Sequence, residues 1–318
     1  MLAIDVKHLS KKFNDFQAIS DISFSVEDGE TFGFLGPNGA GKTTTIRILT
    51  GISAPTEGTA SIFDLDIVKE TITAKKLMGI VPETSNVYDD LSAWRNLMFS
   101  AEMYGISKGV REKRGQELLD LFGLWSRRDD KARGYSKGMK RRLTLAMGLI
   151  NEPRLLFLDE PTSGLDVQSN LIIRDVIRDL NSKGVTVFLT THNIEEANLV
   201  CDRVAIVNKG RIAAIDSPEK LKGTIQSVQS VEVAFDSPSA DIMEVLKKIG
   251  GVSEVRKEGD KFRLYAEDPS IVMPQLMEYS KTHGNRIVSM NTYGPSLEDV
   301  FIKLTGLEVN AKGVRTVE

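Results

Sequence analysis

Two carboxylates stand side by side at the end of an apolar segment in the middle of the chain. The segment "LLFL" (155–158) leads directly into Asp159 and Glu160, and Pro161 then ends the strand pattern. Neighbouring buried carboxylates destabilise a fold unless a metal ion, a basic group or water compensates their charge. We therefore expect such a partner elsewhere in the chain.

A glycine-rich segment supplies this partner. The residues "GPNGAGKT" fit the pattern G-x-x-x-x-G-K-[ST], and they follow the apolar segment "TFGFL" and precede a helical pattern. In such loops backbone N–H groups and the helix start bind phosphate oxygens, the lysine reaches the β- and γ-phosphates, and the hydroxyl binds Mg²⁺. A chance glycine-rich turn is the alternative, and it leaves the flanking strand and helix unexplained. The predicted phosphate-binding residues are Gly36, Pro37, Asn38, Gly39, Ala40, Gly41, Lys42, Thr43 and Thr44.

Together the loop and the acidic pair predict a site for a magnesium nucleoside triphosphate. Thr43 and Asp159 would hold Mg²⁺, directly or through water, while Glu160 would orient and deprotonate the attacking water. Lys42 would stabilise the charge of the phosphates during the reaction. The alternative for the acidic pair is a solvated helix start, which the apolar segment before it disfavours.

Composition indicates a globular protein with two domains. The chain has 318 residues, of which 41% are hydrophobic and 27% charged, with a net charge of −3. This balance argues against nucleic acid as a main ligand. Cys201 is the only cysteine, which excludes a disulfide within the chain and favours a reducing compartment. We expect no membrane-spanning segment, because no stretch approaches the ~20 apolar residues needed.

The elements that must position these residues differ along the chain. Alternating apolar and polar residues over the first forty positions predict antiparallel strands. From Lys42 onward helical patterns alternate with short apolar segments, which is typical of a mainly parallel sheet covered by helices. The acidic pair would then end a strand beside the phosphate loop.

The remainder predicts a small α+β domain of the split-βαβ or ferredoxin-like type. A last helix over 296–304 and a flexible tail over 307–318 complete the prediction. The predicted order is strand 228–235, helix 241–249, strand 252–257, strand 261–266, helix 271–282 and strand 286–291.

The motifs occur in the order found in one family. With "LLFLDEPTSGLD" beside "GPNGAGKTTT", and "YSKGMKRRL" ahead of the former, the chain resembles the ATP-binding subunits of ABC transporters over about residues 1–218. The resemblance implies an α/β P-loop NTPase cassette at 1–222, with a helical subdomain at about 84–150, followed by the α+β domain at 223–306. ATP is favoured over GTP because "NKGR" at Asn208 lacks the aspartate of a guanine-binding motif.

The resemblance also implies residues that bind the nucleotide. Phe13 looks like the aromatic residue that stacks on adenine, with Phe16 as the second candidate and a core aromatic residue as the alternative role. "YSKGM" stands where the family has L-S-G-G-Q, so Ser136 and Gly138 match while the other three positions depart. In the family these two residues touch the nucleotide of a partner subunit, and Asp166 resembles an aspartate that reaches across to it.

Two further residues come from the same resemblance. His192 follows the segment "VTVFLT" and resembles the histidine that contacts the γ-phosphate and steadies the attacking water. Glu83 stands where the family has glutamine, so contact with Mg²⁺ is expected while the amide donor is lost. Arg141 and Arg142 are interpreted as a solvated helix face rather than a nucleic-acid patch.

The function implied by the resemblance is ATP hydrolysis, with ATP and Mg²⁺ as cofactors, by a head-to-tail homodimer that powers export through a separate permease. "PSLEDVFIKLTG" is similar to the ending of subunits that serve drug and antibiotic exporters. Trp94 and Phe99 are candidate permease contacts, or equally core aromatic residues. We expect a cytoplasmic protein, peripheral on the inner face of the cell membrane. The alternatives are a soluble ATPase acting on a ribosome or DNA, and a regulatory ATPase whose C-terminal domain senses a ligand.

Overall fold

The computed structural model describes residues 1–224, 229–239, 241–310 and 313–316. The chain divides into two compact units, an N-terminal unit made mainly of Met1–Pro218 and a C-terminal unit made mainly of Glu219–Val309. Each is described by itself. Within the described residues no helix is long and apolar enough to cross a membrane.

An antiparallel sheet opens the N-terminal unit, as the alternating sequence predicts. Its strand order is β2-β1-β4-β5, and its inward side chains are apolar and buried. The first two strands meet in a tight turn at which Phe13 pairs with Phe16. The strands are β1 (Leu2–Phe13), β2 (Phe16–Glu27), β4 (Glu57–Ile62) and β5 (Leu65–Asp66).

The central sheet has the order β10-β9-β3-β8-β7-β6, and all neighbours are parallel except β10 and β9. All residues of β3, β7 and β8 are buried, because helices and the first sheet cover both faces. The strands are β3 (Thr31–Leu35), β6 (Met78–Val81), β7 (Leu155–Asp159), β8 (Thr186–Thr191), β9 (Arg203–Asn208) and β10 (Arg211–Asp216).

The core of this unit contains an aromatic cluster centred on Phe188. Its ring lies 5.5–6.0 Å from those of Phe24, Phe32, Phe34 and Phe157, measured between centroids. Truncating such a buried ring to alanine typically costs about 3–5 kcal/mol of stability. The cluster therefore fixes the strands whose ends carry the predicted site.

The register of the central sheet brings three sequence motifs to one edge. Leu35 at the end of β3 pairs with Thr191, and Asp159 at the end of β7 pairs with Thr190. The glycine-rich loop follows β3, the acidic pair ends β7 and His192 follows β8. The predicted partners therefore meet at the carboxyl edge of the sheet.

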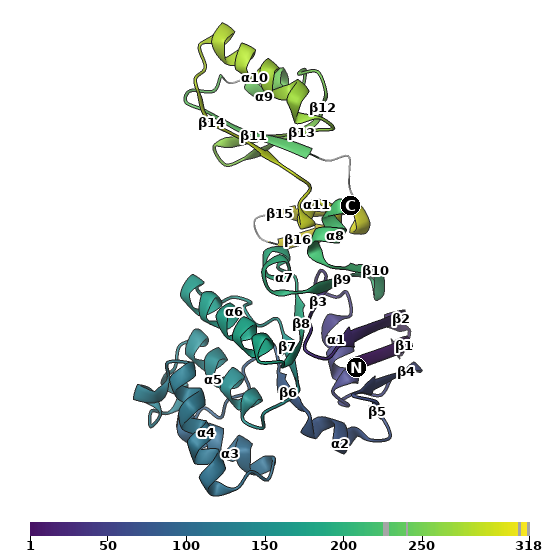
Figure 1. The fold of residues 1–318 in the computed structure, drawn as a ribbon, viewed down its shortest axis with the longest axis vertical. Coiled ribbons are helices and arrows are strands. Elements are labelled where there is room, and N and C mark those ends of the chain that lie inside the picture. The colour runs from purple at the N-terminus through teal and green to yellow at the C-terminus, as the bar shows by residue number, and fades with distance from the viewer. Residues whose placement is uncertain (225–228, 240, 311–312, 317–318) are drawn as a thin grey trace. The chain divides into compact units, whose positions relative to one another are not determined.

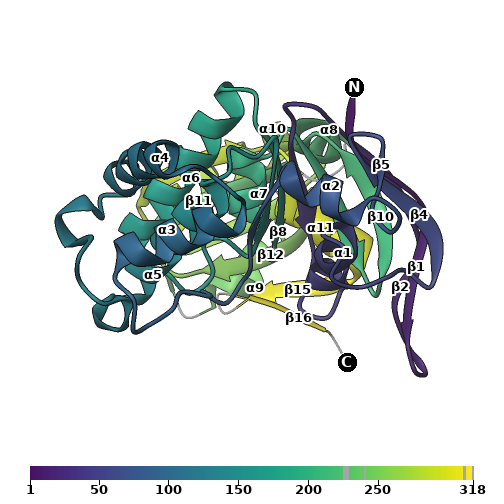
Figure 2. The ribbon, with the colours of Figure 1, turned by 90° about the horizontal axis from the view of Figure 1, so that it is seen from below.

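Helices surround the central sheet, and α3, α4 and α5 contact one another as a group in the region predicted to be helical (Figures 1 and 2). In Figure 2 this group lies on the opposite side of the N-terminal unit from strands β1, β2 and β4. The helices are α1 (Lys42–Leu49), α2 (Thr71–Lys76), α3 (Ala93–Met103), α4 (Lys108–Leu121), α5 (Lys137–Leu149), α6 (Val167–Ser182) and α7 (Ile194–Val200). The next helix, α8 (Pro218–Gly223), belongs to the C-terminal unit apart from its first residue.

The C-terminal unit has the predicted order of elements. Its antiparallel sheet β12-β13-β11-β14 packs its apolar face, including Val231, Val233 and Leu264, against residues of α9 and α10 such as Leu276. This strand order is that of the ferredoxin-like fold. The elements are β11 (Gln229–Phe235), α9 (Ile242–Leu246), β12 (Val252–Glu258), β13 (Lys261–Ala266), α10 (Pro269–His283), β14 (Ile287–Tyr293) and α11 (Leu297–Thr305).

The end of the chain differs from the predicted flexible tail. The described part of 307–318 contains β15 (Leu307–Asn310) and β16 (Gly313–Thr316), which pair as a two-stranded sheet. Both segments contain β-branched residues, which favour strands. Residues 311–312 and 317–318 lie outside the described residues.

Candidate active site

The glycine-rich loop approaches other backbone segments too closely for a side chain. A Cβ atom at Gly36 would lie 2.4 Å from the Val207 carbonyl oxygen, and one at Gly41 would lie 2.7 Å from that of Ala18. Gly41 also has φ of 100°, in the left-handed region that glycine adopts at little cost. The glycines are therefore required to wrap this loop over the end of β3.

The start of α1 presents backbone donors to the same space. The first hydrogen bond within the helix runs from Thr45 N to Gly41 O at 2.9 Å. The N–H groups of Lys42, Thr43 and Thr44 precede this bond, so the helix offers them no acceptor. Together with the helix dipole they form a site that favours an anion.

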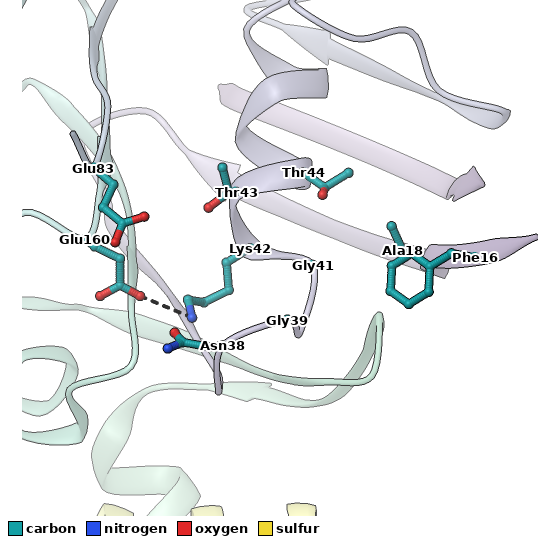
Figure 3. Close-up of a pocket in the computed structure, with 10 residues that line it drawn as sticks. All are labelled: Phe16, Ala18, Asn38, Gly39, Gly41, Lys42, Thr43, Thr44, Glu83 and Glu160. Atoms are coloured by element: carbon teal, nitrogen blue, oxygen red, sulfur yellow. Dashed lines mark ion pairs between the residues drawn. The ribbon is translucent and has the colours of Figure 1, made fainter. Parts of the chain in front are cut away.

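These donors line a cavity of about 400 Å³ (Figure 3). Phe16 and Ala18 of β2 lie on one side of it, the loop and the start of α1 lie in the middle, and the carboxylates of Glu83 and Glu160 lie on the other side. The lining residues are Phe16, Ala18, Asn38, Gly39, Gly41, Lys42, Thr43, Thr44, Glu83 and Glu160.

The aromatic residue beside the cavity is Phe16 rather than Phe13. Phe16 lines the cavity and its side chain is 63% exposed. Phe13 is its partner across the turn, and its ring instead lies 4.9 Å from the Lys11 ammonium. Of the two candidates for adenine stacking, Phe16 is therefore the one that lines the cavity, because the tight turn separates the two rings.

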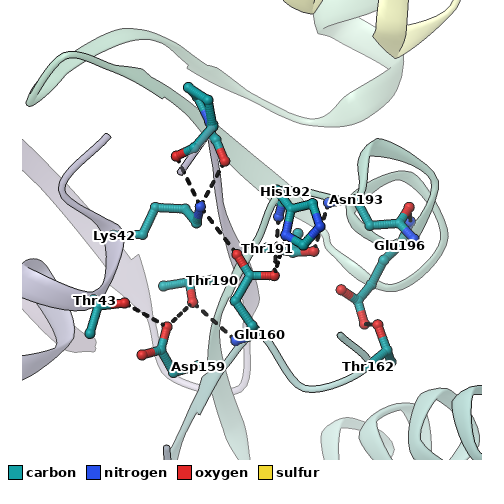
Figure 4. A network of polar contacts seen from close by, with 12 residues as sticks. Lys42, Thr43, Asp159, Glu160, Thr162, Thr190, Thr191, His192, Asn193 and Glu196 are labelled. Carbon is teal, nitrogen blue, oxygen red and sulfur yellow. Dashed lines mark hydrogen bonds and ion pairs between the residues drawn. The ribbon is translucent and has the colours of Figure 1, made fainter. Parts of the chain in front are cut away.

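The ammonium of Lys42 is enclosed by oxygen atoms. Its Nζ donates to Gly36 O at 2.7 Å and to Pro37 O at 3.1 Å, and it lies 3.1 Å from Glu160 Oε1. The side chains of Lys42 and Glu160 are only 6% and 7% exposed. Lys42 is therefore a basic partner of the buried Glu160, a pairing that was not predicted from the sequence (Figure 4).

Asp159 is held by two hydroxyl groups. Its Oδ1 accepts a hydrogen bond from Thr190 Oγ1 at 2.5 Å and another from Thr43 Oγ1 at 3.3 Å. Thr43 and Asp159, two of the three predicted magnesium ligands, are thus adjacent. Thr190 was not predicted, and its position facing Asp159 could have been found only from the register of β7 and β8.

Glu160 lies at the centre of the polar network and has a strained backbone. Its Oε2 contacts His192 Nδ1 at 2.8 Å, and its φ of 48° is in the left-handed region. A hydrogen bond from Glu160 N to Thr190 O at 3.0 Å supports this conformation. Strain of this kind costs about 1–3 kcal/mol and is concentrated at functional sites.

The contact between Glu160 and His192 shifts both pKa values. Burial raises the pKa of the Glu160 carboxyl, but the hydrogen bond to His192 and the charge of Lys42 outweigh burial and hold this pKa below its usual range. The hydrogen bond to Glu160 raises the pKa of His192, against the opposing effect of its burial. Glu160 is therefore an ionised carboxylate at neutral pH, as a proton acceptor must be.

Two family models match the chain. One, described as "ABC transporter", matches residues 19–163, and the other, described as "ATP-binding protein DrrA1-3-like, C-terminal domain", matches residues 217–305. The linearmycin resistance ATP-binding protein LnrL of Bacillus subtilis (strain 168) is 34% identical over 95% of this chain and 98% of its own. The Nod factor export ATP-binding protein I of Rhizobium sp. (strain N33) is 36% identical over 97% and 98% of the two chains.

The chain belongs to the ATP-binding subunits of ABC transporters. It is therefore an ATPase, and its nucleotide is ATP. The resemblance stated from the motifs is confirmed over both units, because the curated relatives align along nearly the whole chain.

Solved structures share the fold of the ABC cassette. The dimeric ATP-binding cassette MJ0796, in a post-hydrolysis state bound to ADP and Pi, is 25% identical with a TM-score of 0.62. The match covers 67% of this chain and 98% of that one. The predicted fold class is thereby confirmed for the ABC cassette.

Besides Phe13, and Gly36, Pro37 and Ala40 of the loop, the three residues predicted to touch a partner subunit's nucleotide are not among the residues that line the cavity. Ser136 caps α5, where its hydroxyl accepts from Met139 N at 3.2 Å. Asp166 caps α6, where its carboxylate accepts from Ser169 N at 2.9 Å. A Cβ atom at Gly138 would lie 2.4 Å from Ser169 Oγ, so the starts of the two helices pack tightly together.

Two buried charged residues near the acidic pair were missed or misinterpreted. Glu196 of α7 is fully buried, accepts from Thr162 Oγ1 at 2.8 Å, and has its pKa raised by burial. Arg141 is not on a solvated helix face, because only 2% of it is exposed and burial lowers its pKa to about 10. The sequence around Arg141, between "YSKGM" and the apolar residues that follow, gives no signal of burial, because helical periodicity does not show which loops cover a side chain.

Proposed function

We propose that this subunit hydrolyses ATP in a head-to-tail pair and thereby powers export of a substrate through a separate membrane permease. The observation that carries the proposal is the position of Glu160, whose two carboxylate oxygens contact Lys42 and His192 beside the phosphate loop. An ionised carboxylate placed between a phosphate-binding cation and a histidine can accept the proton of an attacking water.

In this proposal each residue has a separate task. The N–H groups at the start of α1 and the ammonium of Lys42 bind the β- and γ-phosphates. Glu160 takes one proton as the water oxygen bonds to the γ-phosphorus, and the bridging oxygen leaves with ADP. His192 holds Glu160 ionised and oriented through the contact at 2.8 Å. Phe16 stacks on the adenine ring.

The residues also fit a magnesium ion. Thr43 and Asp159 offer hard oxygen ligands next to each other, and Glu83 lines the same cavity as Thr43. Within the described ranges no group of three or more His, Cys, Asp or Glu side chains could hold a metal by itself. This agrees with Mg²⁺, which proteins bind through one or two side chains together with the phosphates of the substrate. When bound, Mg²⁺ would neutralise charge that develops on the phosphates.

Ser136, Gly138 and Asp166 support the pairing of two subunits. They gather at the starts of α5 and α6 and do not line the cavity of their own chain, so a second copy is the natural recipient of their contacts. The solved cassette MJ0796 is dimeric in a state bound to ADP and Pi. ATP would then join two subunits, and hydrolysis would release them.

Export through a separate permease is supported by the names of the relatives, one for antibiotic resistance and one for Nod factor export. Phe99 of α3 is exposed and fits a contact with such a partner, whereas Trp94 packs against Trp125 at 5.9 Å. We propose that the subunit works on the cytoplasmic face of the membrane through the permease. No observation favours action on a ribosome or DNA, or ligand sensing by the C-terminal unit.

The proposal is tested by the size of the Glu160→Gln variant in solution. This change should leave ATP binding intact while blocking hydrolysis, so the variant should sediment as a dimer with ATP and Mg²⁺ and as a monomer with ADP. Gly138→Leu in the same background is the matched control, because it should displace the starts of α5 and α6, which carry Ser136 and Asp166, and so prevent pairing while leaving the residues of the cavity in place. A monomer with ATP, combined with normal phosphate release, would contradict the proposal.

A further inference from the structure

Arg141 occupies an unusual position among the charged residues of the N-terminal unit. Its side chain is 2% exposed, and its guanidinium makes four hydrogen bonds that all reach backbone carbonyl oxygens. A buried cation usually pairs with a carboxylate, whereas a planar guanidinium can also fix several acceptors in one plane. The identity of these four acceptors therefore shows what Arg141 holds together.

The acceptors belong to two segments that carry the acidic residues of the site. Nη1 donates to Pro82 O through a short contact and to Glu83 O at 3.2 Å. Nη2 donates to Asp159 O at 2.8 Å, and Nε donates to Pro161 O at 3.0 Å. One side chain thus spans the segments that contain all three carboxylates assigned to the site.

The backbone explains why these carbonyls need a side-chain donor. Strands β6 and β7 pair in register as far as Val81 and Leu158, and the ladder ends there. Beyond this point each segment contains a proline, Pro82 or Pro161, which has no N–H to donate. A buried carbonyl group without a hydrogen-bond donor destabilises the fold. The Arg141 guanidinium supplies these donors where β6 and β7 separate and their backbone hydrogen bonds end.

We propose that Arg141 is a positioning residue for ATP hydrolysis: it fixes the spacing between the Glu83 loop and the Asp159–Glu160 segment, so that their carboxylates face the same cavity. This inference rests on the proposed function of these residues. Arg141 does not line the cavity that contains Lys42 and therefore acts through the backbone of its neighbours. Small errors in the placement of reacting groups can lower rates by about 100-fold.

The test uses Arg141→Lys, which keeps the charge but lacks the planar fork, in the full-length chain. We expect kcat to fall by about 10- to 100-fold while KM for ATP and the affinity for ATP without Mg²⁺ change by less than about 3-fold, because the phosphate loop is untouched. Hydrogen exchange measured by mass spectrometry should rise in residues 82–85 and stay unchanged in residues 36–44. The matched control is Arg142→Lys, whose guanidinium bonds Phe122 O at 2.8 Å, and which should behave as the wild type.

A second variant tests whether loss of folding, rather than loss of positioning, explains a lower kcat. Arg141 also lines a cavity of about 460 Å³ with Tyr135, Lys140 and Ser163, which gives a small cation access to the space that Arg141→Ala would leave. Millimolar guanidinium should therefore restore part of kcat in Arg141→Ala and none in Arg142→Ala.

Three outcomes would overturn the inference. The first is a wild-type kcat in Arg141→Lys, and the second is an equal loss of ATP affinity and kcat without any change in exchange at residues 82–85. The third is the absence of guanidinium rescue in an Arg141→Ala protein that is folded. Failure of the proposed function is recognised separately, because the wild-type protein itself would then release no phosphate.

Discussion

The N-terminal and C-terminal units each contain a lysine–glutamate ion pair on the end or face of a sheet, and the two pairs differ in burial. Lys42 and Glu160 lie 3.1 Å apart and are 6% and 7% exposed. Lys261 and Glu232 on neighbouring strands β13 and β11 lie closer, at 2.8 Å, but they are 39% and 12% exposed. Distance alone would therefore rank the wrong pair as the more important.

The difference in burial separates a functional pair from a structural one. Removing two charges from water costs several kcal/mol per ion, and their attraction seldom repays this cost. At Glu160 a left-handed backbone adds further strain. Such a group persists where a function requires it, whereas a pair whose lysine solvent reaches, such as Lys261 with Glu232, is screened and contributes little.

The largest contrast is expected from removing the lysine of each pair. Lys42→Ala should lower the affinity for ATP with Mg²⁺ by about 10- to 100-fold, because charge-assisted hydrogen bonds contribute about 1.5–3 kcal/mol each. Isothermal titration calorimetry measures this affinity directly. Lys261→Ala is the matched control and should bind ATP as the wild type does. Equal affinities for the two variants would remove the functional distinction between the pairs.

A smaller effect is expected from the aromatic residue beside the cavity. Stacking on a base contributes about 1–3 kcal/mol, and the 63% exposure of Phe16 favours the lower part of this range. Phe16→Ala should therefore weaken ATP binding by about 5- to 20-fold. The matched control is Phe13→Ala, which removes the partner ring across the same turn and should change the affinity by less than about 2-fold. Tripolyphosphate, which has no base, should bind both variants equally. A larger loss of ATP affinity in Phe13→Ala than in Phe16→Ala would support Phe13 as the residue that stacks on adenine.

The histidine beside Glu160 provides a titration that no group in the C-terminal ion pair offers. Glu160→Gln should lower the pKa of His192 toward its ordinary value, because the hydrogen bond that raises it involves the carboxylate. NMR titration of the imidazole in the ligand-free protein measures this change. An unchanged pKa in the variant would show that Glu160 does not hold His192.

The same pair predicts how stability depends on pH. Because the pKa of His192 is raised, this residue stabilises the fold at pH values below its ordinary pKa of 6.5. The contribution is lost as pH rises through the pKa of the folded state. The lowered pKa of Glu160 stabilises the fold above its ordinary value of 4.5, and this contribution is lost as pH falls through the folded pKa. The free energy of unfolding of the wild type should therefore exceed that of Glu160→Gln by the largest amount between pH 4.5 and pH 6.5. Urea unfolding at several pH values measures this difference.

The smallest effect belongs to the C-terminal unit. Lys261→Ala should change the melting temperature by less than about 3 °C, because exposed ion pairs contribute little and are screened by salt. Calorimetry at low and high salt would check both statements. A large salt-dependent loss would show that this pair stabilises its unit more than its exposure predicts.

Sequence alone predicted the site where chemistry constrains residue type and spacing. The glycine-rich loop, Asp159, Glu160 and His192 lie at the ends of apolar segments, and parallel strands bring such ends to one edge. The order of elements in the C-terminal unit followed from periodicity in the same way. Boundaries differ by a few residues, as where β12 ends at Glu258 rather than at 257.

What the sequence did not predict depends on geometry that spacing does not encode. Phe13 and Phe16 are equivalent in type, and only the turn between β1 and β2 decides which ring lines the cavity. Arg141 lies in a basic stretch that is typical of a solvated helix, yet the ends of two strands bury it. A residue whose side chain forms hydrogen bonds with the backbone of distant segments cannot be recognised from the sequence around it.

The central claim is that Glu160 accepts the proton of the attacking water while Lys42 and the loop bind the phosphates. Its most direct test is single-turnover phosphate release from Glu160→Gln at saturating ATP and Mg²⁺, with binding measured on the same sample. We predict a loss of about 100- to 10,000-fold in the rate of release, the usual contribution of a general base, with ATP affinity within a few-fold of the wild type. Phosphate release at the wild-type rate would contradict the account.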